Sequence, residues 1–167
     1  VNVRRTTTSY NGLDQPLYVS VRNYLPGVSS PIDSDHIQNQ NTVYEYNDLR
    51  NRTLPTRVTY PGGVNETMTY NNLGELHTKV DRNGVTHEYE YDSIGRRIGD
   101  IITDFGEHAS NIDQFVKKLA FSFDAMGRIT SARSEGGRNG GWGTQNEVQR
   151  QYDELGRLEK EWQSQDG

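Results

Sequence analysis

Histidines are the residues of this chain best suited to acid–base or metal chemistry, and there are four: His36, His77, His87 and His108. His77 and His87 flank one predicted turn. A turn of even length would place them on opposite faces of a two-stranded ribbon, because side chains alternate along a strand. Opposite faces disfavour a shared metal ion, so we interpret both as structural or solvent-exposed histidines.

His108 stands among acidic residues and could form a carboxylate–imidazole cluster with Asp104, Glu107 and Asp113. Nothing in the sequence fixes that geometry, and we interpret the segment as a solvated loop with a short helical turn at 111–118.

The tripeptide "DFG" at 104–106 also occurs in protein kinases. The chain lacks the glycine-rich loop, the catalytic loop and the lysine–glutamate pair of a kinase site, so no kinase activity is predicted.

The segment "GGRNGGWG" at 136–143 is rich in glycine but is not a phosphate-binding loop, since no helix follows a strand there. We interpret it as a hairpin tip that presents Trp142. Two glycosylation triplets begin at Asn51 and Asn65, and a structural role is expected for both asparagines. The sequence therefore predicts no catalytic residue, no cofactor and no metal ion.

The composition favours a sheet protein with a thin core. In 167 residues, 31% are apolar and 25% are charged, with ten tyrosines and 17 glycines. Aromatic residues favour strands and glycines favour tight turns. Disorder is the competing interpretation for so polar a chain, but disordered segments are poor in aromatic residues. One all-β domain is expected from the length.

Charge and hydropathy exclude some partners. The net charge is −5 and no run of lysine or arginine occurs, which argues against a nucleic-acid surface. No stretch approaches the roughly 20 apolar residues of a membrane-spanning helix. The chain has no cysteine, so neither disulfides nor thiolate metal sites are available. Because the sequence begins at Val1 in the middle of a pattern, we expect it to be a piece of a longer protein.

A short phrase recurs six times along the chain and is its most informative feature. Each copy has an aromatic residue, then Asn or Asp, then an apolar residue at the fourth position. The last four copies have Gly at the fifth position, and three of these have Arg at the sixth. The copies begin at Tyr10, Tyr46, Tyr70, Tyr91, Phe123 and Tyr152.

The phrase has the chemistry of a tight turn. Asp or Asn can accept a hydrogen bond from the backbone two residues on, and Gly three residues later accepts the left-handed conformation of a type I turn with a bulge. The matching segments are 92–95, 124–127 and 153–156. In the Tyr46 copy Arg50 stands where Gly is expected, and we predict that Asn51 takes the left-handed conformation in a longer turn.

Between the phrases the alternation predicts five antiparallel hairpins, spanning 17–46, 54–70, 76–91, 98–123 and 129–152. If Asn83 and Gly84 form a two-residue loop, Val80 lies opposite His87 and Leu76 lies opposite Tyr91. His77 and Lys79 would then lie beside Glu88 and Glu90 on the face of the ribbon opposite to that of Leu76 and Val80. Insertions gather at the hairpin tips, so the tips are expected to face solvent or a neighbouring chain while the phrase turns pack side by side.

The phrase and its hairpin spacing resemble the YD-repeat, or Rhs-repeat, family over about residues 10–158. The matching repeat-motif residues are Tyr10, Tyr46, Tyr70, Tyr91, Asp92, Gly95, Arg96, Phe123, Asp124, Gly127, Arg128, Tyr152, Asp153, Gly156 and Arg157. The resemblance implies a β-ribbon wound into a hollow shell, which in bacterial members encloses a C-terminal toxin. The family's self-cleaving segment contains Asp-Pro motifs, and because this chain has no Asp-Pro, no catalytic residue is carried over.

We therefore expect residues 1–167 to form a single non-catalytic module of the wall of such a shell, secreted or at the cell surface and bacterial in origin. Its partners would be the rest of the shell and the enclosed domain. We also expect Tyr70, Tyr91, Phe123 and Tyr152 to stack across neighbouring strands, and the open first and last strands to self-associate. The alternative function is a binding module whose exposed Tyr and Trp residues capture a glycan or a protein.

Overall fold

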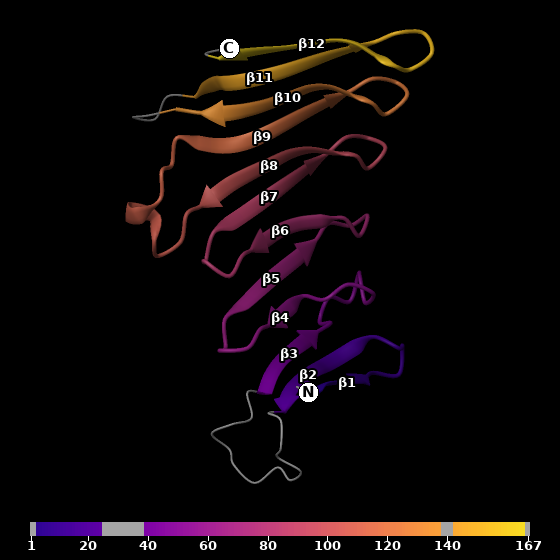
Figure 1. Ribbon diagram of the computed structural model, residues 1–167, viewed down its shortest axis with the longest axis vertical. Coiled ribbons are helices and arrows are strands. Elements are labelled where there is room, and N and C mark those ends of the chain that lie inside the picture. The colour runs from indigo at the N-terminus through magenta and orange to yellow at the C-terminus, as the bar shows by residue number, and fades with distance from the viewer. Residues whose placement is uncertain (1–2, 25–38, 138–141, 166–167) are drawn as a thin grey trace. The chain divides into compact units, whose positions relative to one another are not determined.

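The computed structural model describes residues 3–24, 39–137 and 142–165, and it is all-β, as the sequence predicts (Figure 1). The chain is divided into two compact units, Val1–Gly74 and Glu75–Gly167. Within each unit every strand pairs antiparallel with the strand next to it in sequence. No helix in these described ranges is long and apolar enough to cross a membrane.

The first unit contains five strands, and the second contains seven strands and one short 3₁₀ turn. The strands of the first unit are β1 (Val3–Tyr10), β2 (Pro16–Tyr24), β3 (Asn39–Glu45), β4 (Arg57–Thr59) and β5 (Asn65–Tyr70). The elements of the second are β6 (Leu76–Val80), β7 (Thr86–Tyr91), β8 (Arg97–Asp104), η1 (Ala109–Asn111), β9 (Val116–Phe123), β10 (Ile129–Gly136), β11 (Gly143–Tyr152) and β12 (Leu158–Gln165).

All five expected hairpins occur, as the pairs β2–β3, β4–β5, β6–β7, β8–β9 and β10–β11. Strands β1 and β12 lie outside those hairpins and pair with β2 and β11. Part of the tip between β2 and β3, which includes His36, lies outside the described residues, as do residues 138–141 of the glycine-rich tip.

The predicted register of hairpin 76–91 is wrong by one residue. Lys79 lies opposite His87 and Thr78 opposite Glu88, so Val80 faces Thr86 instead of His87. The reason is the turn, which is not the two-residue loop of Asn83 and Gly84. The Asp81 carboxylate accepts the backbone N–H of Asn83 at 2.8 Å and of Val85 at 2.9 Å, and this holds a longer turn over 81–85.

The shifted register changes which side chains share a face. Because opposite residues project from the same side of a sheet, His77, Lys79 and His87 lie on one face, contrary to the expected separation of the two histidines. Glu90 instead pairs with Lys118 two strands away, at 2.7 Å. It passes over Gly99, where a Cβ atom would lie 2.5 Å from a Glu90 carboxylate oxygen. A side chain at position 99 would therefore displace this ion pair.

The core is thin, as the composition indicates. Among the described residues the buried apolar side chains are Val58, Tyr70, Val85 and Ala120, and no large side chain is completely enclosed. Tyrosine carries part of the burial, since Tyr70 is only 4% exposed. With little apolar burial available, the strand pairing and the contacts between turns must provide much of the stability.

One local prediction needs correction. The helical turn expected at 111–118 lies at Ala109–Asn111, and β9 already begins at Val116. Asp113 accepts the backbone N–H of Phe115 at 3.0 Å, and this local turn brings the chain into β9.

Candidate functional site: a series of linked turns

Each later phrase folds into the same turn, which Asp92 organises in the copy at 92–96. One Asp92 oxygen accepts the backbone N–H groups of Ile94 and Arg96, each at 3.0 Å. The other oxygen accepts Nε of Arg96 at 2.6 Å. Gly95 closes the turn with φ of 80° and donates its N–H to the Asp92 carbonyl at 3.1 Å. This is the turn with a left-handed glycine that the sequence predicts.

The same bonds recur at 124–128 and 153–157. Asp124 accepts Nε of Arg128 at 2.6 Å, and Asp153 accepts Nε of Arg157 at 2.8 Å. The hairpin tip at 81–85 has the same backbone pattern, with Gly84 donating to the Asp81 carbonyl at 3.0 Å. The "DRNGV" tip therefore uses the phrase's turn without its aromatic residue.

The first unit holds two variants of this turn. In the Tyr10 copy Asp14 replaces glycine and adopts a φ of 57°, which Asp tolerates better than most residues. In the Tyr46 copy the prediction for Asn51 is wrong, since Asp14 alone among the described non-glycine residues has a positive φ. Asn51 instead accepts the N–H of Thr53 at 3.1 Å, within the long connection 46–56. Two successive side-chain-capped bends replace the single glycine turn there.

The motif tyrosines anchor the turns through their hydroxyl groups. In three copies the hydroxyl donates to the carbonyl of the first residue of the strand that opens the same hairpin: Tyr46 to Pro16 at 3.0 Å, Tyr91 to Leu76 at 2.8 Å and Tyr152 to Ile129 at 2.9 Å. Tyr70 donates to Pro55 at 2.8 Å, just before β4. Each tyrosine thus ties the end of a hairpin to its beginning.

The sixth residue of a phrase reaches over the following turn. The guanidinium carbon of Arg96 lies 4.8 Å from the centre of the Phe123 ring, and Nη1 of Arg96 donates to the Asp124 carbonyl at 3.0 Å. The guanidinium carbon of Arg128 lies 4.5 Å from the centre of the Tyr152 ring. The expected stacking of motif aromatics on one another is therefore wrong for Phe123 and Tyr152: a guanidinium group of the preceding turn covers each of these two rings.

Other residues at the sixth position make comparable contacts, which the repeated motif did not predict. Gln15 donates from Nε2 to the Arg52 carbonyl, and Asn51 donates from Nδ2 to the Gly74 carbonyl at 3.1 Å. A Cβ atom on Gly95 would lie 2.8 Å from Glu75 Oε1. Their position in the phrase could have predicted these contacts. The motif was defined by Arg at the sixth position, and these copies have Gln, Asn or Glu there instead. We call Gln15, Asn51, Glu75, Arg96, Arg128 and Arg157 the sixth-position residues.

The apolar residue at the fourth position points away from the core in every copy. These side chains are 67–83% exposed: Leu13, Leu49, Leu73, Ile94, Met126 and Leu155. The turn uses only the backbone N–H of this residue, which in Ile94 donates to Asp92, so an apolar side chain is not needed there. The fourth position therefore contributes little to the folding of its own turn.

The turn bonds set the ionisation of the aspartates. Hydrogen bonding from the backbone N–H of Arg96, and then from its side chain, lowers the pKa of Asp92. The N–H and side chain of Arg128 lower the pKa of Asp124 in the same way, and those of Arg157 lower the pKa of Asp153. Burial raises the pKa of the Tyr46, Tyr70 and Tyr91 phenols above the ordinary 10.0. The aspartates are thus held as carboxylates and the phenols as hydrogen-bond donors.

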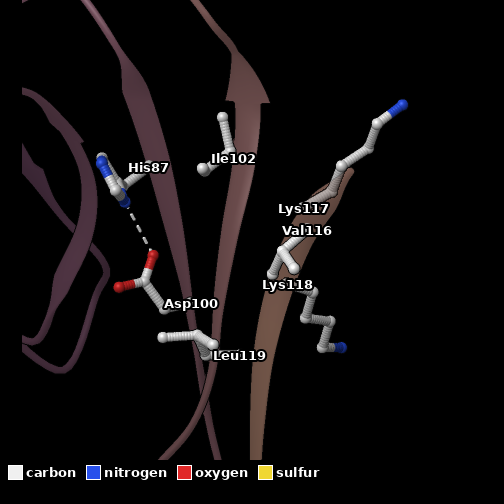
Figure 2. Close-up of a pocket in the computed structure, with 7 residues that line it drawn as sticks. All are labelled: His87, Asp100, Ile102, Val116, Lys117, Lys118 and Leu119. Atoms are coloured by element: carbon white, nitrogen blue, oxygen red, sulfur yellow. Dashed lines mark hydrogen bonds and ion pairs between the residues drawn. The ribbon is translucent and has the colours of Figure 1, made fainter. Parts of the chain in front are cut away.

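One small cavity of about 60 Å³ lies beside a histidine–aspartate pair (Figure 2). Nδ1 of His87 on β7 lies 2.8 Å from Oδ1 of Asp100 on β8. Such a pair could orient an imidazole as a general base. The remaining lining residues are Ile102, Val116, Lys117, Lys118 and Leu119, and Figure 2 shows both lysine side chains extending away from the pair. The lining supplies no hydroxyl or thiol nucleophile for that base to activate.

His108 lies in an open polar hollow between the tip at 82–84 and the loop at 104–108. Asp104, Glu107 and Arg82 line it with His108, so the structure places two of the three expected acidic neighbours there; Asp113 does not line the hollow. Gly106 packs on the backbone of Gly84, where a Cβ atom would lie 2.7 Å from the Gly84 carbonyl oxygen. In the part of the chain that the structure describes, no three His, Cys, Asp or Glu residues are grouped to hold a metal ion.

Consecutive antiparallel hairpins whose ends meet in these turns constitute the fold of YD-repeat shell proteins, which the sequence motifs resemble. A solved structure titled TcdB2-TccC3-TEV matches 93% of this chain with a TM-score of 0.64 at 12% sequence identity. The Photorhabdus luminescens Tc holotoxin pore matches 94% of the chain with a TM-score of 0.45 at 17% identity. The chain spans only 7% and 9% of the length of these two structures. No protein-family model and no curated protein sequence matches the chain.

Proposed function

We propose that residues 1–167 are a non-catalytic YD-repeat module, one section of the wall of a protein shell. The observation that carries this proposal is how the repeated side chains are used. In the copy that begins at Tyr91, the aspartate binds its own turn, the tyrosine binds its own hairpin, and Arg96 at the sixth position binds the next turn. The repeated polar and aromatic groups thus hold each hairpin closed and link it to the next, which is the arrangement expected of a wall.

The same proposal includes what the shell would enclose and the kind of protein to which it would belong. The fold is shared with a segment of a much longer protein in the TcdB2-TccC3-TEV structure. By analogy, the shell would enclose a C-terminal toxin-like domain in a secreted or cell-surface bacterial protein. The partners of this module would then be the neighbouring repeats and the enclosed domain.

Limited proteolysis of the full-length protein that contains this segment tests the proposal. We expect its C-terminal region to resist protease in the unmodified protein and to be digested in an Arg96→Leu, Arg128→Leu double variant, because both cross-turn contacts are lost. Arg50→Leu is the control, since Arg50 is paired with Asp48 inside its own connection. The comparison is made at a temperature where all variants keep their β-sheet circular dichroism. Digestion of the C-terminal region in the unmodified protein, to the same extent as in the double variant, would refute enclosure.

A second candidate function, a binding module, is favoured by two exposed indoles. Trp142 is 58% exposed at a hairpin tip, and Trp162 is 47% exposed on β12. Exposed aromatic rings can stack on sugars or bury against a protein partner. A glycan array together with tryptophan fluorescence tests this function, with Trp142→Ala and Trp162→Ala as separate variants. A signal that both variants lose would support binding, whereas an array without any hit would leave glycan recognition unsupported.

A further inference from the structure

The pair Asn83–Gly84 at the β6–β7 tip has a reactivity that its turn does not use. Glycine has no side chain, so its backbone nitrogen can attack the carboxamide of a preceding asparagine without hindrance. The described residues contain a second such pair, Asn11–Gly12, and a third pair at 139–140 lies outside them. Both described pairs lie in the same kind of turn but at different positions of it, so they form a matched comparison.

Asn11 organises its turn and is held by it. Its carboxamide oxygen accepts the backbone N–H of Leu13 at 2.9 Å and of Gln15 at 3.1 Å. Its amide nitrogen donates to the side-chain oxygen of Gln15 at 2.7 Å. The carboxamide must break all of these hydrogen bonds before its carbon can approach the nitrogen of Gly12. The turn therefore protects Asn11 from this attack.

Asn83 stands at the position of its turn that Leu13 occupies in the first copy, and like Leu13 it is exposed. Among the described residues its carboxamide makes one long hydrogen bond, from Nδ2 to Asp81 Oδ2 at 3.4 Å. The N–H of Gly84 donates to the Asp81 carbonyl at 3.0 Å, so the attack requires the opening of one backbone bond at a hairpin tip. Asn83 also lines the open polar hollow, which gives water access to it.

We propose that Asn83 is a site of spontaneous deamidation in the folded protein, and that its own turn suppresses the same reaction at Asn11. The Gly84 nitrogen bonds to Cγ of Asn83, and the carboxamide nitrogen leaves as ammonia with the proton of the Gly84 N–H. Water then opens the resulting succinimide ring at one of its two carbonyl groups. One opening gives aspartate, and the other gives isoaspartate, whose main chain runs through the side-chain carboxyl carbon. The reaction does not depend on a shell function.

Isoaspartate would change the contact between two hairpin tips. Gly106 of the β8–β9 connection packs on the backbone of Gly84, where a Cβ atom would lie 2.7 Å from the Gly84 carbonyl oxygen. The extra main-chain atom of isoaspartate lies directly before Gly84, so it displaces the surface on which Gly106 packs. We therefore expect deamidation to loosen the loop at 104–108 from the neighbouring tip.

Incubation at neutral pH followed by peptide mapping tests the proposal. Cleavage after glutamate places Asn83 in peptide 76–88 and Asn11 in peptide 1–45, and fragmentation in the mass spectrometer locates the deamidated residue. In the folded chain Asn83 should react about 2- to 30-fold faster than Asn11, which corresponds to one or two additional hydrogen bonds that Asn11 must break. The same ratio is measured in urea, where neither turn exists. A ratio in the folded chain no larger than the ratio in urea would overturn the proposal.

Two substitutions assign the rates to the structure. Gln15→Ala removes the bond to the Asn11 amide nitrogen, so it should raise the deamidation rate of Asn11 and leave that of Asn83 unchanged. Asn83→Gln should abolish the signal from peptide 76–88, because the longer side chain forms a six-membered ring far more slowly. An Asn11 rate that does not rise in Gln15→Ala would exclude hydrogen bonding of the carboxamide as the source of protection.

Hydrogen exchange tests the effect on the neighbouring tip. Anion-exchange chromatography separates deamidated chains from the aged sample by their added negative charge. Asn83→Asp is the control, because it supplies this charge without the isoaspartyl main chain. Exchange at 104–109 should be faster in the deamidated fraction than in Asn83→Asp, and the turn at 153–157 should exchange equally in both. Equal exchange at 104–109 would overturn the expected loosening.

Discussion

The guanidinium carbon of Arg96 lies 4.8 Å from the centre of the Phe123 ring, although the two residues belong to different turns. Arg96 is simultaneously bound to Asp92 of its own turn at 2.6 Å. A single side chain therefore closes one turn and covers the aromatic residue of the next. This dual use explains why a short phrase can order a sheet whose core is thin.

Replacing Arg96 by Lys should destabilise the chain more than replacing Arg157 by Lys. Both arginines bind an aspartate of their own turn, but only Arg96 covers a following ring and donates to a following carbonyl. We expect a difference of about 0.5–2 kcal/mol in the free energy of unfolding, since lysine stacks less well and cannot make the forked contact.

Urea denaturation of both variants at equal, low protein concentration measures this difference. Arg157 is the internal control for the bond within a turn, because its guanidinium covers no ring among the described residues. Equal destabilisation by the two substitutions would mean that the contact between turns contributes no measurable stability.

Phe123 offers a substitution that should stabilise the protein. Tyr46, Tyr91 and Tyr152 each donate a hydroxyl to the first residue of the strand that opens their hairpin. For Phe123 that residue is Arg97 of β8. Phe123→Tyr should therefore add one hydrogen bond worth about 0.5–1.5 kcal/mol, and Tyr91→Phe should remove a similar amount.

Thermal unfolding followed by circular dichroism tests both changes. The double variant Phe123→Tyr, Tyr91→Phe should unfold close to the temperature of the unmodified chain if the two sites act independently. A lower unfolding temperature for Phe123→Tyr would show that the space beside Arg97 does not admit the hydroxyl.

The sequence was sufficient to predict the hairpins but not every register. The Asp-x-x-Gly spacing identified the turns at 92–95, 124–127 and 153–156, because the turn depends on local hydrogen bonds. The tip at 81–85 has the same spacing, yet its Asn83–Gly84 pair also predicts a two-residue loop, which the structure does not have. Comparing Asp81 with Asp92 would have corrected that register.

Contacts between turns could not be derived from local patterns. Gln15, Asn51 and Glu75 act at the sixth position with three different side chains, and their partners lie in the next turn. The pairing of His87 with Asp100 likewise depends on how β7 and β8 align, where an irregularity lies between Thr86 and His87. Such contacts depend on the register of neighbouring strands, which local sequence does not specify.

Gly136 and Gly143, which lie opposite each other on β10 and β11, should respond very differently to alanine. A Cβ atom on Gly136 would overlap the Phe115 carbonyl oxygen, which also accepts the N–H of Gly137. Gly136→Ala must therefore shift the backbone, at a cost of about 1–3 kcal/mol. Gly143 has no heavy atom within 4 Å of such a Cβ, so Gly143→Ala should stay within about 0.5 kcal/mol of the unmodified chain.

The two alanine variants are compared by their midpoints of urea denaturation. Hydrogen exchange at residues 116–123 gives a second measurement, because displacement of Phe115 should loosen the start of β9. If the Gly136 variant is as stable and as well protected as the Gly143 variant, the close approach at Phe115 is not a constraint on the fold.

Acid should destabilise the linked turns through their aspartates. The pKa values of Asp92, Asp124 and Asp153 are lowered in the folded chain, first by backbone N–H bonds for all three. A lowered folded pKa means that the stabilisation is complete above the ordinary value of 3.8 and is lost as the pH falls through the folded values. We therefore expect the free energy of unfolding to fall steadily as the pH is lowered below about 4.

The aspartate contribution can be isolated with asparagine, which already occupies this position in the Tyr10 and Tyr70 phrases. Asp92→Asn, Asp124→Asn and Asp153→Asn combined should keep the turns, because the amide oxygen still accepts backbone N–H groups, as Asn71 does from Leu73 at 2.9 Å. Urea midpoints measured across the acid range should fall less steeply in this triple variant than in the unmodified chain. Glu154→Gln, an exposed carboxylate in the last turn, is the control and should retain the full acid slope. An unchanged slope in the triple variant would assign acid sensitivity to other carboxylates, and the aspartates of the turns would then have no measurable role in it.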